Sequence, residues 1–339
     1  MASELTMEFV DPNDRRQPLT REGDAFVSAA GRRYPIVDGI PRFVESRDRG
    51  QAQTAASFGY KWTRQPDWAA RENSDDVIWS MWRGMLGFGP DRLRELMTGK
   101  VVLDAGCGSG VALRLFAPWP AEIAAVDISE AVDACKMLLD GKGRITFVQA
   151  DLNALPFAEA SFDVVWSSGV LHHTPDTFAA LRAVARHARV GGRVAFYVYV
   201  KKAPIREFVD DHIRREISDL PPADAWRRME ALTRLGRSLA AIKQPLEIDA
   251  DVPELGGNAG TYDLQRFAYY HLFKCFWNDA LSFDENVNVN FDWYHPKYAH
   301  RQTPEQVRGW LAELHLEPEF FNIGESGITV IARNEGRPR

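Results

Sequence analysis

The order of apolar and polar residues divides the middle of the chain into alternating strand-like and helix-like segments. The segments between the strand candidates carry apolar residues at the three-to-four-residue spacing of helices. Strands that alternate with helices predict right-handed βαβ units and a parallel sheet. Five apolar runs predict the buried strands, at residues 101–105, 122–129, 144–151, 162–168 and 193–200.

Start and stop signals predict the elements that follow the fourth strand. A helix is expected to begin at the cap-like residues 174–176 and to end at the glycine pair 191–192. Near the C-terminus, Thr303 is an expected N-cap for an amphipathic helix. Two strand-like runs then predict a closing hairpin, at residues 317–323 and 327–333.

About a hundred residues interrupt this core after its fifth strand. One amphipathic helix is expected from Ile205, Phe208, Val209 and Ile213, and a second from Trp226, Met229, Leu232, Leu235 and Leu239. The insertion leaves the sheet at its C-terminal edge, where open α/β folds bind ligands. We interpret it, with its aromatic run 262–277, as a substrate cap. The alternative is a stabilising appendage whose aromatic residues form their own core.

These patterns divide the chain into four expected parts. They are an N-terminal appendage (1–95), a ligand-binding core (96–200), a helical and aromatic insertion (201–301) and a C-terminal completion of the core (302–339).

Composition excludes several classes of protein. The net charge of −6 gives no basic footprint for nucleic acid. The three cysteines, far apart in sequence, form no disulfide framework, so we expect a reducing cytoplasm. No apolar run reaches the ~18 residues of a membrane span, and the N-terminus does not resemble a signal peptide. The oligomeric state is not predicted.

A glycine loop follows the first predicted strand in the sequence VVLDAGCGSG. Glycines in a strand-to-helix turn adopt positive φ and allow a ligand to approach the main chain. The dinucleotide fingerprint is G-x-G-x-x-G, whereas Gly106, Gly108 and Gly110 are spaced G-x-G-x-G. Asp104, at the end of the strand, would repel a phosphate and suits a ligand with an ammonium group.

Three acids stand at the ends of three successive predicted strands. Asp127, 23 residues after Asp104, can accept both hydroxyls of a ribose, although NAD enzymes place an acid at the same point. Asp151 ends the third strand. Each acid taken singly could be a solvated turn residue or a helix cap. Together they favour a nucleoside site.

The loop resembles motif I of class I S-adenosylmethionine-dependent methyltransferases, and residues 167–176 (SSGVLHHTPD) resemble the ubiquinone- and menaquinone-type small-molecule subfamily. The resemblance implies an α/β fold, a Rossmann-like doubly wound seven-stranded sheet with an antiparallel C-terminal strand. It implies S-adenosylmethionine as cofactor, with the Asp151 carboxylate on the adenine amino group and the Leu152 N–H facing a ring nitrogen. The expected cofactor-binding residues are Asp104, Gly106, Gly108, Gly110, Asp127, Ile128, Asp151, Leu152 and Ser167.

An N-terminal segment resembles a small zinc-ribbon domain with the sequence Y-P-I-x-D-G-I-P. That family has flanking cysteines, but here Ala30 precedes Gly31 and no cysteine occurs before Cys107. A thiolate site needs thiolates, so we expect a metal-free hairpin and no metal. Cys107 itself is interpreted as a small residue that fits the glycine loop.

Candidate catalytic and substrate residues lie in three segments. His172 or His173 could act as a general base, because an unperturbed imidazole titrates near ~6.5. Alternatively, one packs under the loop and the other hydrogen-bonds to the backbone. Aromatic faces attract a sulfonium cation, although ordinary packing would also explain the clusters at 57–68 and 290–303. The substrate candidates in these clusters are Tyr60, Trp62, Tyr294, His295 and Tyr298, with Asp292 and His300 as further polar groups.

We therefore expect methyl transfer from S-adenosylmethionine to a small-molecule acceptor, with an oxygen, nitrogen, sulfur or carbon nucleophile. One alternative is an NAD(P)-dependent oxidoreductase, which Asp104 and the G-x-G-x-G spacing disfavour. The other is a non-catalytic S-adenosylmethionine-binding module.

Overall fold

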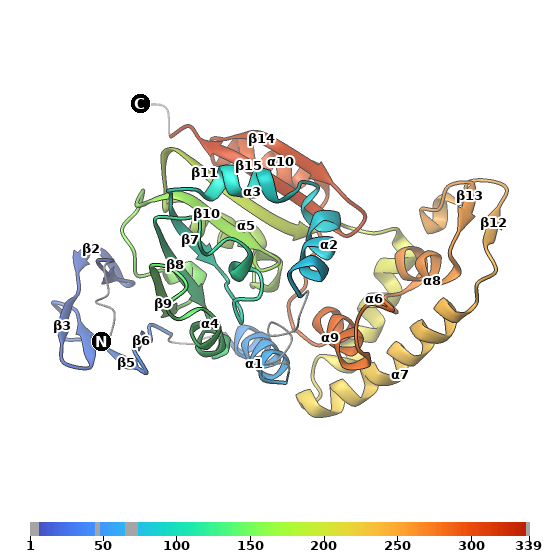
Figure 1. Cartoon of the computed structure of the whole chain (residues 1–339), viewed down its shortest axis with the longest axis horizontal. Coiled ribbons are helices and arrows are strands. Elements are labelled where there is room, and N and C mark those ends of the chain that lie inside the picture. Colours follow the sequence, from blue (N-terminus) through green and yellow to red (C-terminus); the bar gives the residue numbers. More distant parts are fainter. Residues whose placement is uncertain (1–6, 45–47, 65–73, 337–339) are drawn as a thin grey trace.

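A seven-stranded mixed sheet lies at the centre of the computed structural model, which describes residues 7–44, 48–64 and 74–336. The strand order is β14-β15-β11-β10-β7-β8-β9, and β15 runs antiparallel to both of its neighbours (Figure 1). This topology confirms the predicted Rossmann-like fold with its antiparallel C-terminal strand. The strands are β7 (Val101–Ala105), β8 (Glu122–Asp127), β9 (Ile145–Gln149), β10 (Phe162–Ser168), β11 (Ala188–Tyr199), β14 (Leu316–Ile323) and β15 (Gly327–Asn334).

Two apolar clusters bury the two faces of this sheet. Successive side chains of a strand point to opposite faces, so Val102 joins one cluster and Leu103 the other. Leu93 and Leu139 cover the face of Val102, and Leu181 packs in the cluster with Leu103. The helices that flank the sheet are α2 (Ser74–Leu86), α3 (Pro90–Met97), α4 (Ala131–Leu139), α5 (Thr177–Ala185) and α10 (Pro304–Glu313).

The fifth strand begins earlier than predicted. Helix α5 ends at Ala185 and β11 starts at Ala188, so the glycine pair 191–192 lies inside a strand and does not end a helix. The pairing of β10 with β11 shifts register between Phe162 and Val164, which marks a bulge. Gly191 has φ +79°, a conformation that side chains disfavour, and it therefore signals the bulge.

The N-terminal residues that the structure describes form two small antiparallel sheets, of two and four strands, beside β9 at the edge of the molecule opposite the insertion (Figure 1). The Phe43 N–H donates to the Gln149 carbonyl at 2.7 Å, and the Phe9 ring packs 5.7 Å from that of Phe157. No group of three or more metal-ligating side chains occurs among the residues described. The strands are β1 (Val10–Asp11), β2 (Asp14–Pro18), β3 (Thr20–Glu22), β4 (Ala25–Val27), β5 (Arg33–Val37) and β6 (Ile40–Pro41).

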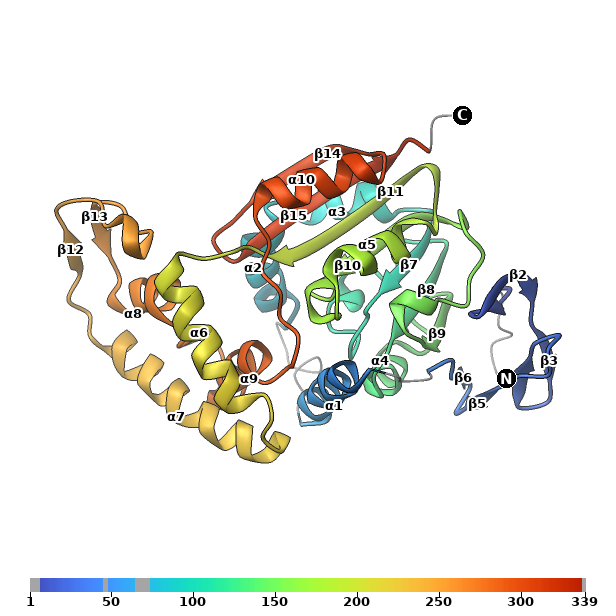
Figure 2. The same ribbon diagram turned by 180° about the vertical axis from the view of Figure 1, so that it is seen from behind.

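The insertion forms a helical unit at the other end of the molecule, with α1 (Arg49–Thr63) between it and the sheet (Figure 2). Trp226, Met229 and Phe291 form its apolar core. Its elements are α6 (Pro204–Ile217), α7 (Pro222–Ala241), β12 (Leu246–Ile248), β13 (Gly260–Tyr262), α8 (Leu264–Phe267), a π-helical turn (Ala268–Leu272) and α9 (Phe283–Tyr294). None of the helices described is both long and apolar enough to cross a membrane.

Helix α6 buries a different face from the one its apolar residues predict. Phe208 is 67% exposed, whereas Arg206 and Asp210 are each 1% exposed. The Arg206 guanidinium and the Asp210 carboxylate lie 2.5 Å apart. This pairing allows a charged face to be buried, which apolar periodicity cannot indicate. Leu235 of α7, also predicted to be buried, is 43% exposed.

Candidate functional site

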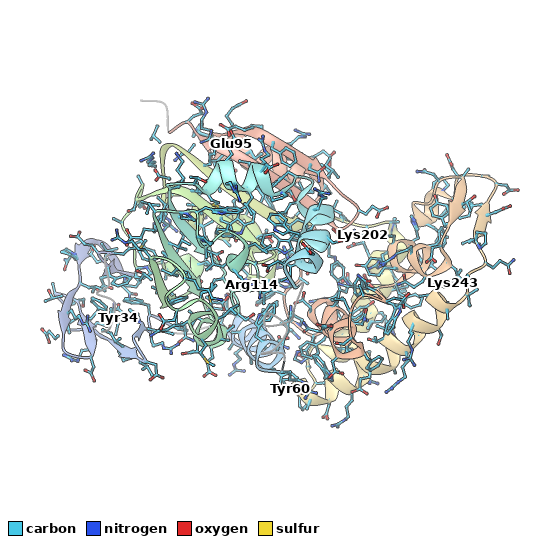
Figure 3. The ribbon with its side chains drawn as sticks, viewed as in Figure 1. Tyr34, Tyr60, Glu95, Arg114, Lys202 and Lys243 are labelled. Carbon is cyan, nitrogen blue, oxygen red and sulfur yellow. The ribbon has the colours of Figure 1, made fainter. Side chains whose placement is uncertain are left out.

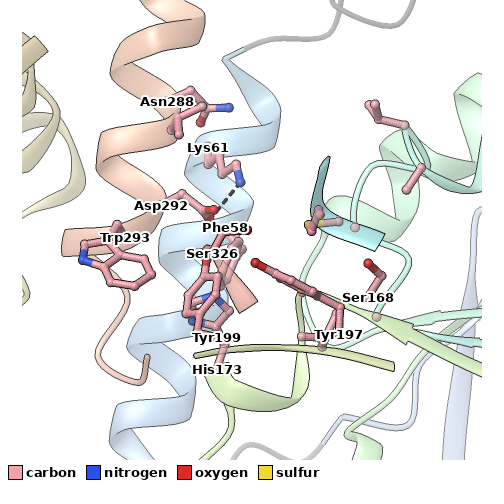
Figure 4. A pocket seen from close by; sticks show the side chains of 18 of the residues that line it. Phe58, Lys61, Ser168, His173, Tyr197, Tyr199, Asn288, Asp292, Trp293 and Ser326 are labelled. Carbon is pink, nitrogen blue, oxygen red and sulfur yellow. Dashed lines mark ion pairs between the residues drawn. The ribbon is translucent and has the colours of Figure 1, made fainter. Parts of the chain in front are cut away.

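A cavity of about 640 Å³ lies between the C-terminal edge of the sheet and the insertion. Small-molecule sites usually measure roughly 300–1,000 Å³. The glycine loop forms one end, and α9, α1 and the end of β11 contribute Asp292, Lys61 and Tyr199, which face one another across the space (Figure 4). One cavity therefore joins the predicted cofactor loop to the insertion.

The glycines of the loop have positive φ, and a side chain at these positions would be strained or would collide with neighbouring residues. Gly106 and Gly108 line the cavity with φ +105° and +52°. A Cβ on Gly106 would overlap Val170. Gly110 does not line the cavity; a Cβ there would lie 2.7 Å from the Cys135 sulfur, so this glycine allows α4 to pack closely.

Asp127, at the end of β8, holds the loop and faces the cavity. Its Oδ2 accepts from the Gly108 N–H at 2.9 Å, and its Oδ1 accepts from the Ser129 N–H and hydroxyl at 2.8 and 2.7 Å. Burial raises the pKa of this carboxyl, although these hydrogen bonds oppose the shift. A carboxylate has about four acceptor positions, so Oδ2 can accept a further bond from a ligand.

Asp104 lies beneath the loop and does not line the cavity. It is 3% exposed, and no ion pair among the residues described includes it. Burial, together with the negative charge of Asp127, raises the pKa of Asp104 to about 8. A buried acid without a cation beside it fits a site completed by a positively charged ligand.

The other predicted cofactor residues divide between the cavity wall and its supports. Ile128 and Leu152 line the cavity. Asp151 accepts from the Asn153 N–H at 2.8 Å and caps the short helix after β9, outside the wall. The Ser167 hydroxyl donates to the Ala105 carbonyl at 2.8 Å and also lies outside the wall, whereas the next residue, Ser168, lines it.

Of the two histidines, His173 faces the cavity and His172 lies behind it. The His173 Nδ1 lies 2.6 Å from the Tyr298 carbonyl. A carbonyl can only accept, so Nδ1 carries the proton and Nε2 is the unprotonated nitrogen. Nε2 has no partner among the residues described, and burial lowers the pKa of His173 to about 4. His172 is fully buried, with its ring centroid 3.7 Å from that of Tyr199.

Among the substrate candidates, only Trp62 lines the cavity. A Cβ on Gly108 would lie 3.3 Å from its indole nitrogen, so Trp62 covers the glycine loop. Residues 65–68 of the first aromatic cluster lie outside the described part of the chain.

The other four candidates hold the surrounding helices together. The Tyr294 hydroxyl donates to Asp210 at 2.6 Å, and the Tyr298 hydroxyl donates to Asp48 at 3.0 Å. The His295 Nδ1 lies 2.8 Å from the Ser57 hydroxyl, while the Tyr60 ring packs against Trp226 and Phe291. The side chains of these four candidates do not line the cavity.

The charged groups of the cavity were mostly missed by the sequence reasoning. The Lys61 Nζ and the Asp292 Oδ1 form an ion pair at 2.9 Å (Figure 4). Lys202, Arg206 and Lys274 also line the wall. Lysines and arginines are common on surfaces, so nothing in the sequence distinguishes these from solvated ones. Burial lowers the pKa of Lys274 to about 7 and that of Lys202 to about 8.

Comparison with known proteins adds to this geometry. Residues 103–196 match the family described as "Methyltransferase domain". The chain is 38% identical over 113 residues to 27-O-demethylrifamycin SV methyltransferase of Amycolatopsis mediterranei, a match that covers 31% of this chain and 42% of that protein. It is 29% identical over 179 residues to a ubiquinone biosynthesis O-methyltransferase of Pseudomonas fluorescens, covering 47% and 77%.

The sequence matches cover only part of this chain and only part of the related proteins. The chain spans about two fifths of the length of the first curated relatives that it matches. Among solved structures, a SAM-dependent methyltransferase from Aquifex aeolicus aligns with a TM-score of 0.40 and 14% identity, covering 77% of this chain and 97% of that one.

Proposed function

We infer that this chain, whose residues 103–196 match the methyltransferase-domain family, is a class I S-adenosylmethionine-dependent enzyme that transfers a methyl group to a small-molecule acceptor. One observation carries the inference: a single cavity joins Gly106, Gly108 and Asp127 to an aromatic wall supplied by the insertion. Two relatives support a small acceptor, because their names refer to a rifamycin and to ubiquinone biosynthesis.

The residues at the glycine loop fit the cofactor. When bound, S-adenosylmethionine supplies an electrophilic methyl group on a cationic sulfur. We propose that the free acceptor position of Asp127 binds the ribose, with Ile128 and Leu152 beside the base. The positive charge of the bound cofactor would favour the ionised form of Asp104 beneath the loop, whose pKa burial otherwise raises to about 8. The indole of Trp62 excludes water from the loop.

We propose His173 as the proton acceptor when the nucleophile is a hydroxyl or an amine. Its Nε2 is unprotonated, buried and on the cavity wall. A pKa of about 4 keeps the imidazole neutral at neutral pH, and the nearby Asp292 carboxylate favours the protonated form once a proton arrives. His172 lacks access to the cavity and is proposed to pack behind it.

We also propose that residues 201–301 act as the substrate cap, that residues 1–95 form an N-terminal appendage and that residues 302–339 complete the core. Tyr269, Tyr270, Lys274 and Phe276 of the insertion line the cavity, which supports the cap. A cytoplasmic protein that does not bind nucleic acid agrees with three buried free cysteines and a net charge of −6.

The test is methyl transfer from isotope-labelled S-adenosylmethionine to a panel of small phenols, carboxylic acids and amines. We expect labelled product with at least one acceptor class, and stoichiometric S-adenosylhomocysteine. Binding of the cofactor without turnover on any acceptor would support the non-catalytic module instead.

A further inference from the structure

We propose that the acceptor is an aromatic compound that carries a carboxylate, and that Lys202 and Lys274 bind this carboxylate. The proposal rests on the proposed function and names the substrate class for the same cavity. It goes beyond the proposed function in assigning two buried ammonium groups as the contacts of one anionic ligand.

Cationic side chains outnumber anionic side chains on the cavity wall. Four cationic side chains line it, those of Lys61, Lys202, Arg206 and Lys274. The three anionic ones are Asp127, Asp292 and Glu325, and Asp127 belongs to the cofactor end. The acceptor end therefore carries four cations and two anions before any cofactor binds.

Two of the four cations already have partners. Lys61 pairs with Asp292 at 2.9 Å. Arg206 pairs with Asp210, which lies behind the wall and also accepts from the Trp293 indole at 2.9 Å and the Tyr294 hydroxyl at 2.6 Å. These two hydrogen bonds stabilise the Asp210 carboxylate, which neutralises Arg206. The carboxylate therefore has few acceptor positions left for another cation.

The remaining two cations have no carboxylate within ion-pair distance among the residues described. The Lys202 Nζ is buried without a hydrogen-bond partner. Lys274 is 6% exposed, and its Nζ lies 4.6 Å above the ring of Trp293. Burying a charge without a partner costs several kcal/mol, so both ammonium groups are suited to an anionic ligand.

The two lysines share one region of the wall. Lys202 stands two residues before α6, whose Arg206 lies 5.7 Å from the centre of the Trp293 ring, the same ring over which the Lys274 Nζ lies. The Lys274 backbone N–H also donates to Asp210 at 3.1 Å. A single anionic group at this end of the cavity would therefore lie near both ammonium groups.

The rest of the wall is suited to a flat, apolar scaffold. Phe58, Tyr197, Tyr199, Tyr269 and Trp293 line the acceptor end. Two aromatic rings attract when offset or edge to face, which favours an aromatic ligand over a flexible chain of the same charge. The bound cofactor is itself cationic, so an anionic acceptor also balances the charge of the filled cavity.

The first experiment compares charged and uncharged probes on the full-length chain saturated with S-adenosylhomocysteine. Calorimetry would measure the affinities of 4-hydroxybenzoate, its uncharged amide 4-hydroxybenzamide, and phenyl phosphate. We expect 4-hydroxybenzoate to bind at least tenfold more tightly than the amide and more tightly than phenyl phosphate. Equal affinities, no binding of the acid, or a preference for the phosphate would overturn the proposal.

The second experiment assigns the contact. Lys202→Gln and Lys274→Gln should each weaken 4-hydroxybenzoate about tenfold and leave the amide unchanged. Lys243→Gln is the matched control, because Lys243 is exposed at the far end of the insertion, away from Lys202 (Figure 3). Loss of acid affinity equal to that of the control would contradict the assignment.

A third readout needs no variant. An anion beside Lys202 and Lys274 favours their protonated forms, so at pH 8 binding should take up protons. The enthalpy would then depend on the ionisation enthalpy of the buffer. The other charged groups that influence the pKa of these lysines are Lys61, Arg206, Glu207, Asp210, Asp292 and Glu325. No proton uptake would contradict the proposal, whereas failure to bind S-adenosylhomocysteine would contradict the proposed function instead.

Discussion

Strand β7 and helix α6 both position residues near the cavity, yet they are buried by different means. In β7 the buried side chains Val102 and Leu103 are apolar and fully inaccessible. In α6 the buried side chains are charged, and Arg206 and Asp210 neutralise each other while Phe208 faces outward. Apolar burial is a property of each residue alone, whereas charged burial depends on a partner elsewhere in the fold. Apolar patterns in the sequence therefore predict the buried faces of the core strands, but they do not predict which face of α6 in the insertion is buried.

The largest expected effect comes from breaking the charged burial. Asp210→Ala leaves Arg206 as an unpaired buried cation and should reduce the free energy of unfolding by about 3–5 kcal/mol. Chemical denaturation measures the change. Phe208→Ser on the same helix is the control and should change stability by less than about 0.5 kcal/mol, because that side chain is 67% exposed. Equal losses in the two variants would show that α6 is buried on its apolar face after all.

The next effect concerns the loop of the core that faces the insertion. His173→Ala removes the proposed proton acceptor and should lower turnover on a hydroxyl acceptor roughly 10²-fold, with S-adenosylhomocysteine affinity nearly intact. In the wild type, turnover should rise with pH through about 4 and then level off, because a base acts in its unprotonated form. His212→Ala, exposed on α6, is the control. An unchanged rate in His173→Ala would remove the base from the mechanism.

A smaller effect is expected at the cofactor end of the core. Asp127→Ala should weaken S-adenosylhomocysteine by about 1.5–3 kcal/mol, the scale of hydrogen bonds to a charged group. The variant also removes the acceptor of the Gly108 N–H, so the melting temperature must be measured alongside. Asp140→Ala, exposed at the end of α4, serves as the matched variant. Unaltered binding would make Asp127 a turn residue only.

A further prediction concerns the insertion: the affinity for an acidic acceptor should depend on pH. The pKa of Lys274 is lowered to about 7 and that of Lys202 to about 8, and a lysine is cationic only below its pKa. Raising the pH from 6.5 to 8.5 should therefore weaken an aromatic acid by roughly tenfold. The affinity of the matching amide should stay constant. A parallel decline for both ligands would point to a change in the fold.

No effect is expected from metal removal. The N-terminal segment has no cysteine, and there Asp11 accepts from the Tyr34 hydroxyl at 2.8 Å. Treatment with a chelator should leave the melting temperature unchanged, and metal analysis should find no stoichiometric zinc. About one zinc per chain would indicate a site of histidines or carboxylates.

Sequence patterns predicted the sheet because each of its strands is set by local apolar runs and nearby turn residues. The glycine loop and Asp127 were found for the same reason, since their spacing is fixed within one βα unit. The bulge in β11 was not predicted, because a glycine such as Gly191 can mark either the end of a helix or a bulge in a strand. Lys202 and Lys274 were missed because their burial depends on how the insertion folds over the sheet.

The most direct test of the central claim, that the glycine loop holds S-adenosylmethionine, is a calorimetric titration of the ligand-free protein with S-adenosylhomocysteine and with NAD. The glycines are spaced G-x-G-x-G rather than as the dinucleotide fingerprint G-x-G-x-x-G, and Asp127 faces the cavity beside them. We predict a single site of micromolar Kd for S-adenosylhomocysteine and negligible binding of NAD. Tight binding of NAD with none of S-adenosylhomocysteine would contradict the account.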